Sequence, residues 1–254
     1  MTAIAQMEWR KLRSVRSTWW MMAVFAAGMI GIAILVMKNQ HWTSLSASDK
    51  ASFDGVDDGY AGLALGQLVL GILGVLAITT EFSSGLIRAT FAAAPSRPRV
   101  LAAKAAVLAA VTLVAGEILA FAAYWAGQAA LKSPAPHVTL GQPGVLRAVL
   151  MAGAYPALIA LIGLGFGAII RHTAGAICAV VGVVFVLPLL LVPMGTSVQH
   201  AADKFLPMLM SENSMSAVKP VAHSLPAAVS FALLCGYAAV ALGAGAWMLA
   251  RRDA

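Results

Sequence analysis

Six long apolar runs limit what this chain of 254 residues can fold into. A helix needs about 20 apolar residues to cross a hydrocarbon core about 30 Å thick. Only 11% of the residues are charged, whereas roughly 25% are charged in an average soluble domain, so polar groups are too few to cover a globular surface. The chain is therefore predicted to be an all-α integral membrane protein, with six transmembrane helices at residues 19–37, 60–78, 100–131, 146–170, 174–194 and 226–250.

The apolar runs leave no stretch long enough for a soluble module, so residues 1–254 are predicted to form a single transmembrane domain. Glycines four residues apart recur inside the spans, at Gly62 and Gly66 and at Gly163 and Gly167. This spacing either allows helices to cross closely or arises by chance in a chain rich in Ala and Gly.

Lys and Arg are distributed unevenly between the two sides of the predicted membrane. The N-terminus, the connection between spans two and three, the turn at Arg171 and the C-terminus hold eleven of the 17 basic residues. Short cytoplasmic loops carry an excess of Lys and Arg, so both termini are predicted to be cytoplasmic. The basic residues form no tract long enough to follow a phosphate backbone, and no nucleic-acid partner is predicted.

Residues 1–18 precede the first span and are predicted to form a helix that lies along the membrane surface. Apolar residues share one face of this helix, as an interfacial helix requires. Glu8 and Lys11 intrude on that face. They lie three residues apart, so they either pair with each other or contact another protein.

A polar and basic connection, "TTEFSSGLIRATFAAAPSRPRVLAAK" at residues 79–104, separates two apolar runs. Its residues 81–94 are predicted to form a short amphipathic helix, which Pro95 ends. The alternative is an ordinary solvated helix in a loop. The apolar positions of the helix recur at helical spacing, and they are Phe82, Leu86, Ala89 and Ala93.

The last outer loop, residues 195–224, is long for a helix connection and partly apolar, so it is predicted to re-enter the membrane as short helices. Thioether and imidazole groups gather there, which would suit a soft metal such as Cu(I). Their irregular spacing favours packing instead, and no metal site is predicted. The residues concerned are Met194, Met208, Met210, Met215, His200 and His223.

The sequence contains no motif for catalysis: G-x-x-x-x-G-K-[ST], H-E-x-x-H and G-x-S-x-G are all missing. If the chain takes part in an energised machine, nucleotide hydrolysis takes place on another polypeptide. The chain itself is therefore predicted to be no enzyme and to bind no cofactor directly.

Glu117 lies near the middle of the third predicted span, in "VAGEILAF". A carboxylate at that depth costs several kcal/mol unless it is paired, solvated or protonated. Glu117 is therefore predicted either to face a translocation path or a subunit interface, or to be protonated and hydrogen-bonded to a neighbouring backbone.

Four stretches resemble the six-span permease subunits of ABC-2 type ATP-binding-cassette transporters, particularly the short stand-alone permeases of actinobacterial type. They are "EWRKLRSVRSTWW" at 8–20, residues 79–104, "GLGFGAIIRHTAGAICAVVG" at 163–182 and "LARRDA" at 249–254. The resemblance implies a type V exporter-like permease fold in a bacterial cytoplasmic membrane, with an interfacial helix that includes Glu8, Trp9, Arg10 and Lys11.

The resemblance also implies partners. Residues 81–94 would be a coupling helix that docks into a separate ATPase subunit through Glu81, Phe82, Ser84, Gly85, Leu86 and Arg88. The turn at Arg171 and His172 would be a second, smaller contact. Two permeases, as a homodimer or with a related partner, would join two ATPases that carry ATP and Mg. Glu117 belongs to none of the four stretches, so the resemblance gives it no role.

Three functions are consistent with the sequence. The first is export of a small hydrophobic or amphipathic cargo, such as a drug, lipid, peptide or metabolite. The second is a non-transporting membrane protein for immunity or sequestration, and a soft-metal permease is a variant of the first. An intramembrane enzyme is the third.

Overall fold

The structure is a computed structural model, which describes residues 2–93, 96–195, 198, 204–217 and 225–251. These residues form helices and no strand. Six helical segments among them are long and apolar enough to cross a membrane, which confirms the predicted number of spans. They are α2 (Arg16–Lys38), α4 (Leu63–Ser83), α6 (Arg97–Ala130), α7 (Val145–Ile170), the segment Thr173–Leu191 and α12 (Ala227–Arg251).

The remaining elements are short. The N-terminal helix α1 is Thr2–Ser14, and the connection between α4 and α6 contains α5 (Leu86–Ala93). The segment Thr173–Leu191 consists of α8 (Thr173–Val181), a π-helical turn η3 (Gly182–Val186) and α9 (Leu187–Leu191). The other short elements are η1 (Trp42–Ser44), α3 (Ala47–Ser52), η2 (Asp58–Tyr60), η4 (Val192–Met194) and α11 (Pro207–Met215).

Two predicted boundaries were wrong. The helix predicted at residues 1–18 ends at Ser14, because Val15 adopts an extended conformation and α2 starts at Arg16. The second span was predicted at residues 60–78, but α4 runs from Leu63 to Ser83. The other predicted spans agree with the structure to within three residues at each end.

Helix α7 lies at the centre of the bundle, where it packs against α4, α6 and α12. Small residues on several of its faces allow this. A Cβ atom added at Gly163 would overlap the backbone of Gly71 in α4, and one added at Gly153 would overlap Glu117 in α6. On the side of α12, a Cβ atom at Gly165 would lie 2.6 Å from the carbonyl carbon of Ala241. Of the two alternatives left open for the spacing of Gly163 and Gly167, the structure therefore shows the close crossing.

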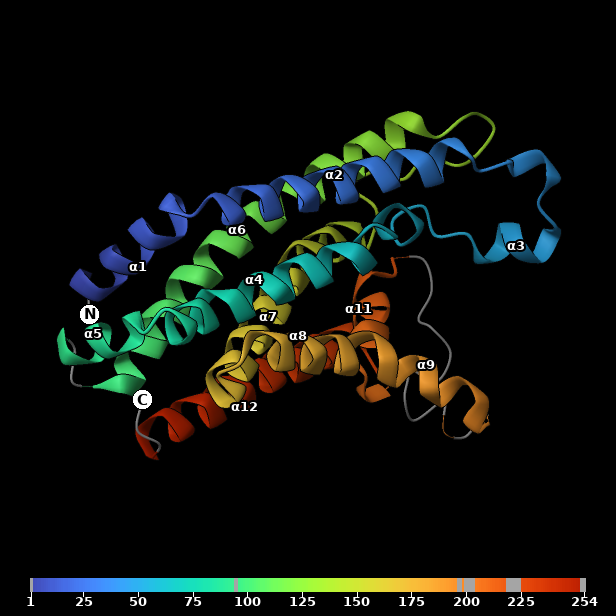
Figure 1. The fold of residues 1–254 in the computed structure, drawn as a ribbon. Helices are drawn as coiled ribbons and strands as arrows, with labels where there is room; N and C mark the ends of the chain where they lie inside the picture. The colour runs from blue at the N-terminus through green and yellow to red at the C-terminus, as the bar shows by residue number, and fades with distance from the viewer. Residues whose placement is uncertain (1, 94–95, 196–197, 199–203, 218–224, 252–254) are drawn as a thin grey trace.

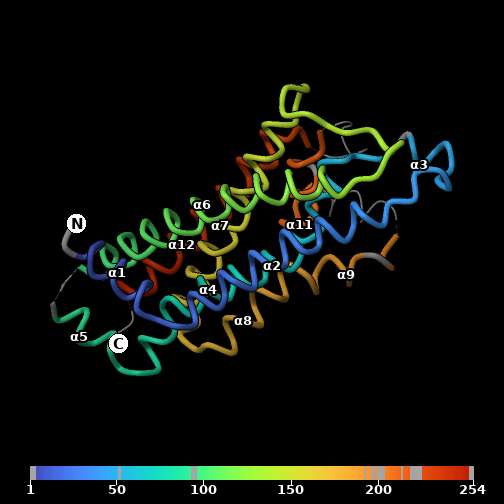
Figure 2. Tube along the Cα trace, turned by 90° about the horizontal axis from the view of Figure 1, so that it is seen from above, coloured from blue at the N-terminus to red at the C-terminus, as the bar shows by residue number. Residues whose placement is uncertain are grey.

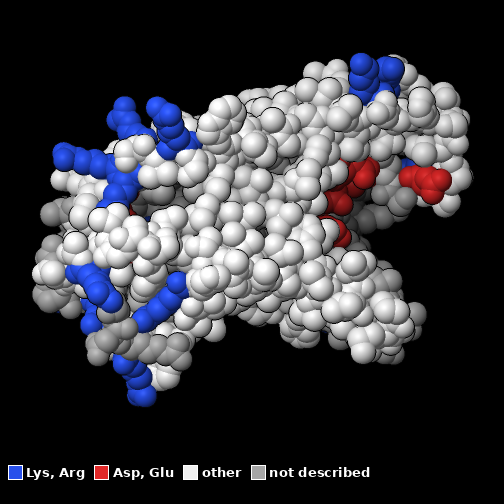
Figure 3. Space-filling model, in the orientation of Figure 1, with Lys and Arg blue, Asp and Glu red and all other residues white. Residues whose placement is uncertain are grey.

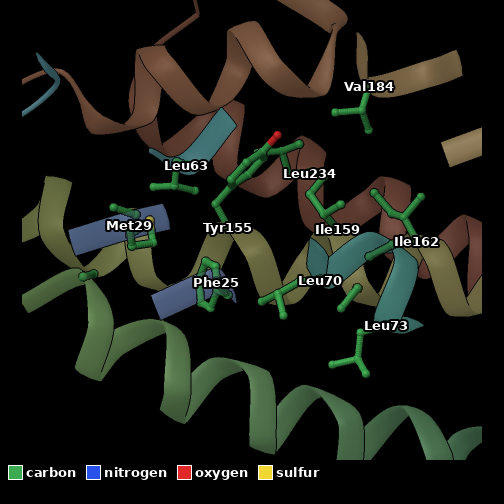
Figure 4. Packing of buried hydrophobic residues seen from close by; sticks show 14 of the residues in the cluster. Phe25, Met29, Leu63, Leu70, Leu73, Tyr155, Ile159, Ile162, Val184 and Leu234 are labelled. Carbon is green, nitrogen blue, oxygen red and sulfur yellow. The ribbon is translucent and has the colours of Figure 1, made fainter. Parts of the chain in front are cut away.

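Large apolar side chains fill the remaining space around α7. Figure 4 shows Tyr155 and Ile159 of α7 among side chains from α2, α4 and α12, including Phe25, Leu70 and Leu234. Each of these five side chains is at most 2% exposed. Between helices in a bilayer, close packing of such side chains stabilises the bundle through van der Waals contacts, so this cluster fixes the positions of the spans.

Both chain ends and α5 lie at one end of the bundle, while α3 lies at the opposite end (Figures 1 and 2). We call the first of these the basic end, since the Lys and Arg side chains of α1, α5 and the start of α6 gather there (Figure 3). The prediction that this end faces the cytoplasm stays a prediction.

The predicted outer loop, residues 195–224, is described only in part. Residues 196–197, 199–203 and 218–224, including His200 and His223, lie outside the described residues. Within the described part, α11 packs against α7, α12 and η3. Met210 and Met215 are buried in the core cluster, at 0% and 3% exposure, as expected for packing residues.

Candidate functional site

A single helix was predicted at residues 81–94, but the structure divides this stretch into the last turn of α4, a sharp turn at Gly85 and the helix α5. Helix α4 continues to Ser83, so Glu81 and Phe82 belong to its last turn. Ser84 caps α4, and its hydroxyl donates a hydrogen bond to the Thr80 carbonyl at 2.7 Å. Gly85 has a φ of 73°, a left-handed conformation that costs other residues about 1–2 kcal/mol. The chain therefore turns at Gly85 before α5 starts.

The turn and α5 present an exposed tip. Ser84, Gly85, Leu86 and Arg88 are all exposed, and Leu86 is 58% exposed although it is apolar. The opposite face of α5 is buried, with Ile87 at 3% exposure. We call these four exposed residues the α5 tip. It combines an apolar and a cationic group on a surface that is free within one copy of the chain.

Glu81 does not belong to the tip, because its side chain turns into the bundle. Its carboxylate is 8% exposed and accepts hydrogen bonds from Lys104 of α6 at 2.8 Å and from Lys11 of α1 at 2.9 Å. The hydrogen-bond partners of Glu81 thus lie within its own chain. The predicted contact between Glu81 and an ATPase subunit stays a prediction.

Glu8 of α1 completes the group. Its Oε2 accepts a hydrogen bond from Lys104 at 2.5 Å, and its Oε1 accepts one from Lys11 at 3.2 Å. We call Glu8, Lys11, Glu81 and Lys104 the charge cluster. It joins α1, the end of α4 and the first turns of α6, with two carboxylates balanced by two ammonium groups.

The charge cluster explains the two charged residues on the apolar face of α1. Glu8 and Lys11 do pair with each other, as one of the two predicted alternatives had it, and they also bind charges on α4 and α6. Burial of Lys11 favours its neutral form, but hydrogen bonds and charges from Glu81 and Glu8 outweigh burial and raise the pKa of Lys11 above its usual value. Lys11 therefore stays charged at neutral pH.

Lys104 reaches this cluster because α6 is longer than a membrane crossing needs. Its 34 residues span about 51 Å at 1.5 Å per residue, so the first turns extend beyond a core about 30 Å thick. The sequence analysis placed Lys104 in the basic connection but gave it no partner. The sequence did contain a signal for this pairing, because the two acids and two bases of the charge cluster lie at otherwise apolar positions near one membrane surface.

The other residues named for α1 face outward. Trp9 is 50% exposed and Arg10 is exposed. One helical face of α1 thus binds the bundle through Glu8 and Lys11, while the adjacent residues Trp9 and Arg10 are free to contact lipid or protein. This division agrees with a helix at a membrane surface.

The turn between α7 and α8 lies beside the same connection. Arg171 caps α7 with a φ of 60°, and His172 caps α8 by accepting a hydrogen bond from the Gly175 N–H at 3.4 Å. The Arg171 guanidinium lies 5.2 Å from the ring centroid of Phe82 and donates a hydrogen bond to the Met248 carbonyl at 3.4 Å. The structure therefore brings together Arg171 and Phe82, which the sequence assigned to two separate contacts.

Glu117 lies inside the bundle, against α7. Its carboxyl carbon would be 2.6 Å from a Cβ atom at Gly153, so the absence of a side chain at Gly153 makes room for it. Its Oε2 is buried and has no hydrogen-bond partner among the described residues. The role of Glu117 in a translocation path stays a prediction.

A second group of charges lies at the end opposite to the basic end, in the recess where Figure 3 shows acidic side chains. Asp57, Asp58 and Glu212 line a cavity of about 210 Å³ there, together with Tyr155, whose hydroxyl donates a hydrogen bond to Gln67. Burial raises the pKa of Asp57 to about 7, with further contributions from the nearby charges of Glu212, Asp54 and Asp58.

In the part of the chain that the structure describes, no group of three His, Cys, Asp or Glu residues is arranged to hold a metal ion.

The comparisons with known proteins agree with this architecture. A family model described as ABC-2 family transporter protein matches residues 4–198. The match includes most of α1, the α5 tip, the charge cluster and the turn at Arg171. A comparison with curated proteins finds none that matches the chain. Because the family model covers well over half of the sequence, the chain belongs to the ABC-2 family of transporter proteins.

Proposed function

We propose that this ABC transporter permease is an exporter subunit driven by a separate ATPase. It moves a small hydrophobic or amphipathic cargo across a bacterial cytoplasmic membrane. Two copies of the permease, or one copy and a related chain, assemble with two ATPase subunits that bind ATP and Mg. Family membership supports the permease role, and the lack of a phosphate-binding motif in the sequence supports a separate ATPase.

The α5 tip carries this proposal. It is the point where a contact from outside reaches both α4 and α6, since α5 connects these two spans directly. A partner that binds Leu86 and Arg88 pushes on a short helix whose buried face packs on the bundle. Apolar side chains beside an arginine are typical of protein interfaces.

The charge cluster would pass this motion onward. Lys104 holds α1 to α6, and Glu81 holds the end of α4 to both. A displacement of the α5 tip therefore moves α1, α4 and α6 together, since the ion pairs of the charge cluster hold these three helices to one another. The contact between Arg171 and Phe82 extends the connection to the turn after α7.

The basic end faces the cytoplasm in this proposal. The ATPase subunits then bind at the end where α1, α5 and the turn at Arg171 lie, and the acidic cavity near Asp57 opens on the outer side. This orientation of the chain in the membrane is supported by the excess of Lys and Arg at the basic end.

The test is a pull-down of the tagged chain from its own membranes in mild detergent, followed by mass spectrometry and an ATPase assay. We expect a protein with a phosphate-binding loop to co-purify. Arg88→Glu reverses a charge on the α5 tip without touching the charge cluster, so it should reduce the recovered ATPase at least about tenfold. Lys132→Glu is the matched control, since Lys132 is exposed in the connection that follows α6, away from the basic end.

Two results would contradict the proposal. The first is recovery of an intact, folded chain without any ATPase, which would favour a stand-alone protein for immunity or sequestration. The second is an equal loss of ATPase in Arg88→Glu and Lys132→Glu, which would show that the α5 tip is not the contact.

A further inference from the structure

A cavity of about 310 Å³ lies at the junction where α1 ends and α2 begins, with α6 as its third wall. Its volume is at the lower end of the range of roughly 300–1,000 Å³ that is common for ligand sites. Its lining is apolar apart from Arg13 and Thr18, and the apolar residues are Trp9, Leu12, Trp19, Met22 and Val111. We call this space the junction cavity. Walls of this composition suit hydrocarbon.

Two sets of contacts fix the shape of the junction cavity. The indole N–H of Trp19 in α2 donates a hydrogen bond to the Arg13 carbonyl of α1 at 2.9 Å. Carbonyls in the last turn of a helix have no partner within the helix, so this bond completes the end of α1 and holds the indole across the corner. Another face of α1 is held to α4 and α6 by the ion pairs of Glu8 and Lys11. The cavity is therefore built into the folded chain.

Exposed tryptophans mark the depth of the junction cavity. Trp9, Trp19 and Trp20 are 50%, 61% and 73% exposed, and they lie on either side of the corner between α1 and α2. Tryptophan is enriched at the level of lipid headgroups. The corner therefore lies where the headgroups of one membrane leaflet lie.

Three exposed arginines surround this corner. Arg13 lines the cavity, Arg10 lies one turn before it on α1, and Arg16 is the first residue of α2. Glu8 is the only acid among residues 1–48 of the sequence, and it is already paired with Lys11 and Lys104. In the part of the chain that the structure describes, the ion pairs do not include these three arginines. Their positive charge is therefore left for a partner outside the chain.

These charges favour one class of lipid headgroup. A guanidinium group binds a phosphate with paired hydrogen bonds. Every phospholipid carries a phosphate, but the ammonium group of phosphatidylethanolamine or phosphatidylcholine offsets its charge. Basic residues near a membrane surface therefore attract lipids with a net negative charge. The apolar cavity beside the arginines favours a ligand with an acyl chain over free phosphate.

We propose that the junction cavity binds an anionic phospholipid of the phosphatidylglycerol class. The phosphate contacts Arg13, while Arg10 and Arg16 add to the attraction. An acyl chain lies against Met22 and Val111, so the lipid fills the angle between the surface helix and the first span. The site lies outside the charge cluster, and the proposal depends neither on the ATPase partner nor on the cargo.

The experiment is native mass spectrometry of the full chain, purified in detergent and mixed with equal amounts of phosphatidylglycerol, phosphatidylethanolamine and phosphatidylcholine with identical acyl chains. We expect bound phosphatidylglycerol to exceed each of the other two at least about tenfold, because each arginine near the headgroup adds roughly fivefold. Equal binding of the three lipids, or a preference for either zwitterionic one, would overturn the proposal. So would displacement of the lipid by a soluble glycerophosphate, since the acyl chain would then contribute nothing.

A pair of variants separates a site from the general positive charge of the basic end. Arg13→Gln should reduce the excess of phosphatidylglycerol about fivefold. Arg99→Gln removes the same charge at an exposed position in the first turn of α6, outside the cavity lining, and it should leave the excess as it was. An equal reduction in both variants would show that the lipid is attracted by the whole basic end and not bound at the corner.

A second pair tests the apolar part without altering a charge. Val111→Trp fills the cavity from α6 and should reduce bound phosphatidylglycerol at least about fivefold, the loss of roughly one side-chain contact. Val114→Trp is the same change three residues further along α6, where Val114 is 59% exposed, and it should bind the lipid normally. Normal binding by a folded Val111→Trp chain would show that the lipid binds elsewhere. If Val111→Trp does not fold, the comparison of Arg13→Gln with Arg99→Gln still decides the proposal.

Discussion

Lys104 donates a hydrogen bond to Glu8 at 2.5 Å, although the two residues are 96 positions apart in the sequence. The side chains of Lys104 and Glu8 are 5% and 3% exposed. The bond ties the N-terminal helix to the third span, and Glu81 ties both to the end of the second span. These four charges therefore link α4 and α6, the two spans that flank the α5 tip, to α1.

Removal of Lys104 should destabilise the chain strongly. Lys104→Met leaves two buried carboxylates with Lys11 alone, and breaking a buried ion pair from one side costs about 3–5 kcal/mol. We expect a marked decrease in the midpoint of thermal unfolding in detergent. The double variant Glu8→Gln/Lys104→Met should lose less than the sum of the single changes, with a coupling energy of about 1–3 kcal/mol. Additive losses would show that the two residues act independently.

The close crossing of α4 and α7 should tolerate no side chain at Gly163. Gly163→Ala places a methyl group on the backbone of Gly71, and main-chain atoms in a packed bundle cannot move aside at low cost. We expect little folded protein after extraction, measured as the monodisperse fraction in size-exclusion chromatography. Gly31→Ala in α2 meets nothing within 4 Å and should extract normally, so a similar loss in both variants would argue against this explanation.

Two substitutions of Glu117 should have different effects. Glu117→Gln keeps the shape of the side chain beside Gly153, so we expect normal folding and ATPase assembly with altered transport if Glu117 lines the path. Glu117→Lys puts a longer cation into the same space at mid-membrane depth and should reduce insertion or folding. The measurements are membrane yield and transport. Normal transport by Glu117→Gln would rule out the path and leave a structural role.

Asp57 should make stability depend on pH. A carboxyl pKa raised from 3.8 to about 7 means that the folded chain binds the proton more tightly than the unfolded chain. The contribution is therefore complete below the unfolded pKa and is lost as the pH rises towards 7. We expect the thermal midpoint to fall as the pH rises from about 4 to about 7, and the slope of this dependence to flatten in Asp57→Asn. Asp49→Asn, at an exposed position in α3, is the control, and an unchanged slope in Asp57→Asn would assign the effect to another group.

Hydropathy predicted the spans well because lipid imposes one simple requirement, about 20 apolar residues per crossing. It failed at the end of α4. There the sequence reads as the start of a polar connection, yet α4 continues through Glu81, whose carboxylate pairs with Lys11 and Lys104 inside the bundle. A pairing between residues 23 and 70 positions apart has no local signature, and hydropathy cannot detect it.

The glycine spacing was ambiguous for a related reason. Gly163 and Gly167 both lie against α4, near Gly71 and Ile78, but an identical spacing in a sequence rich in small residues carries no information about the partner helix. A short helix in this connection was predicted, but its apolar face was not, since Leu86 is exposed beside Arg88 and Ile87 is the buried residue. Its first residue was misplaced because the left-handed turn at Gly85 separates it from α4.

The charge cluster also fixes an order of events during synthesis. Glu8 enters the membrane surface early, but its buried partner Lys104 lies beyond two complete spans, and Glu81 lies at the end of the second. Until α6 has been inserted, the N-terminal helix has only Lys11 to balance its carboxylate. The N-terminal helix, although made first, therefore reaches its final position only after α6 has been inserted.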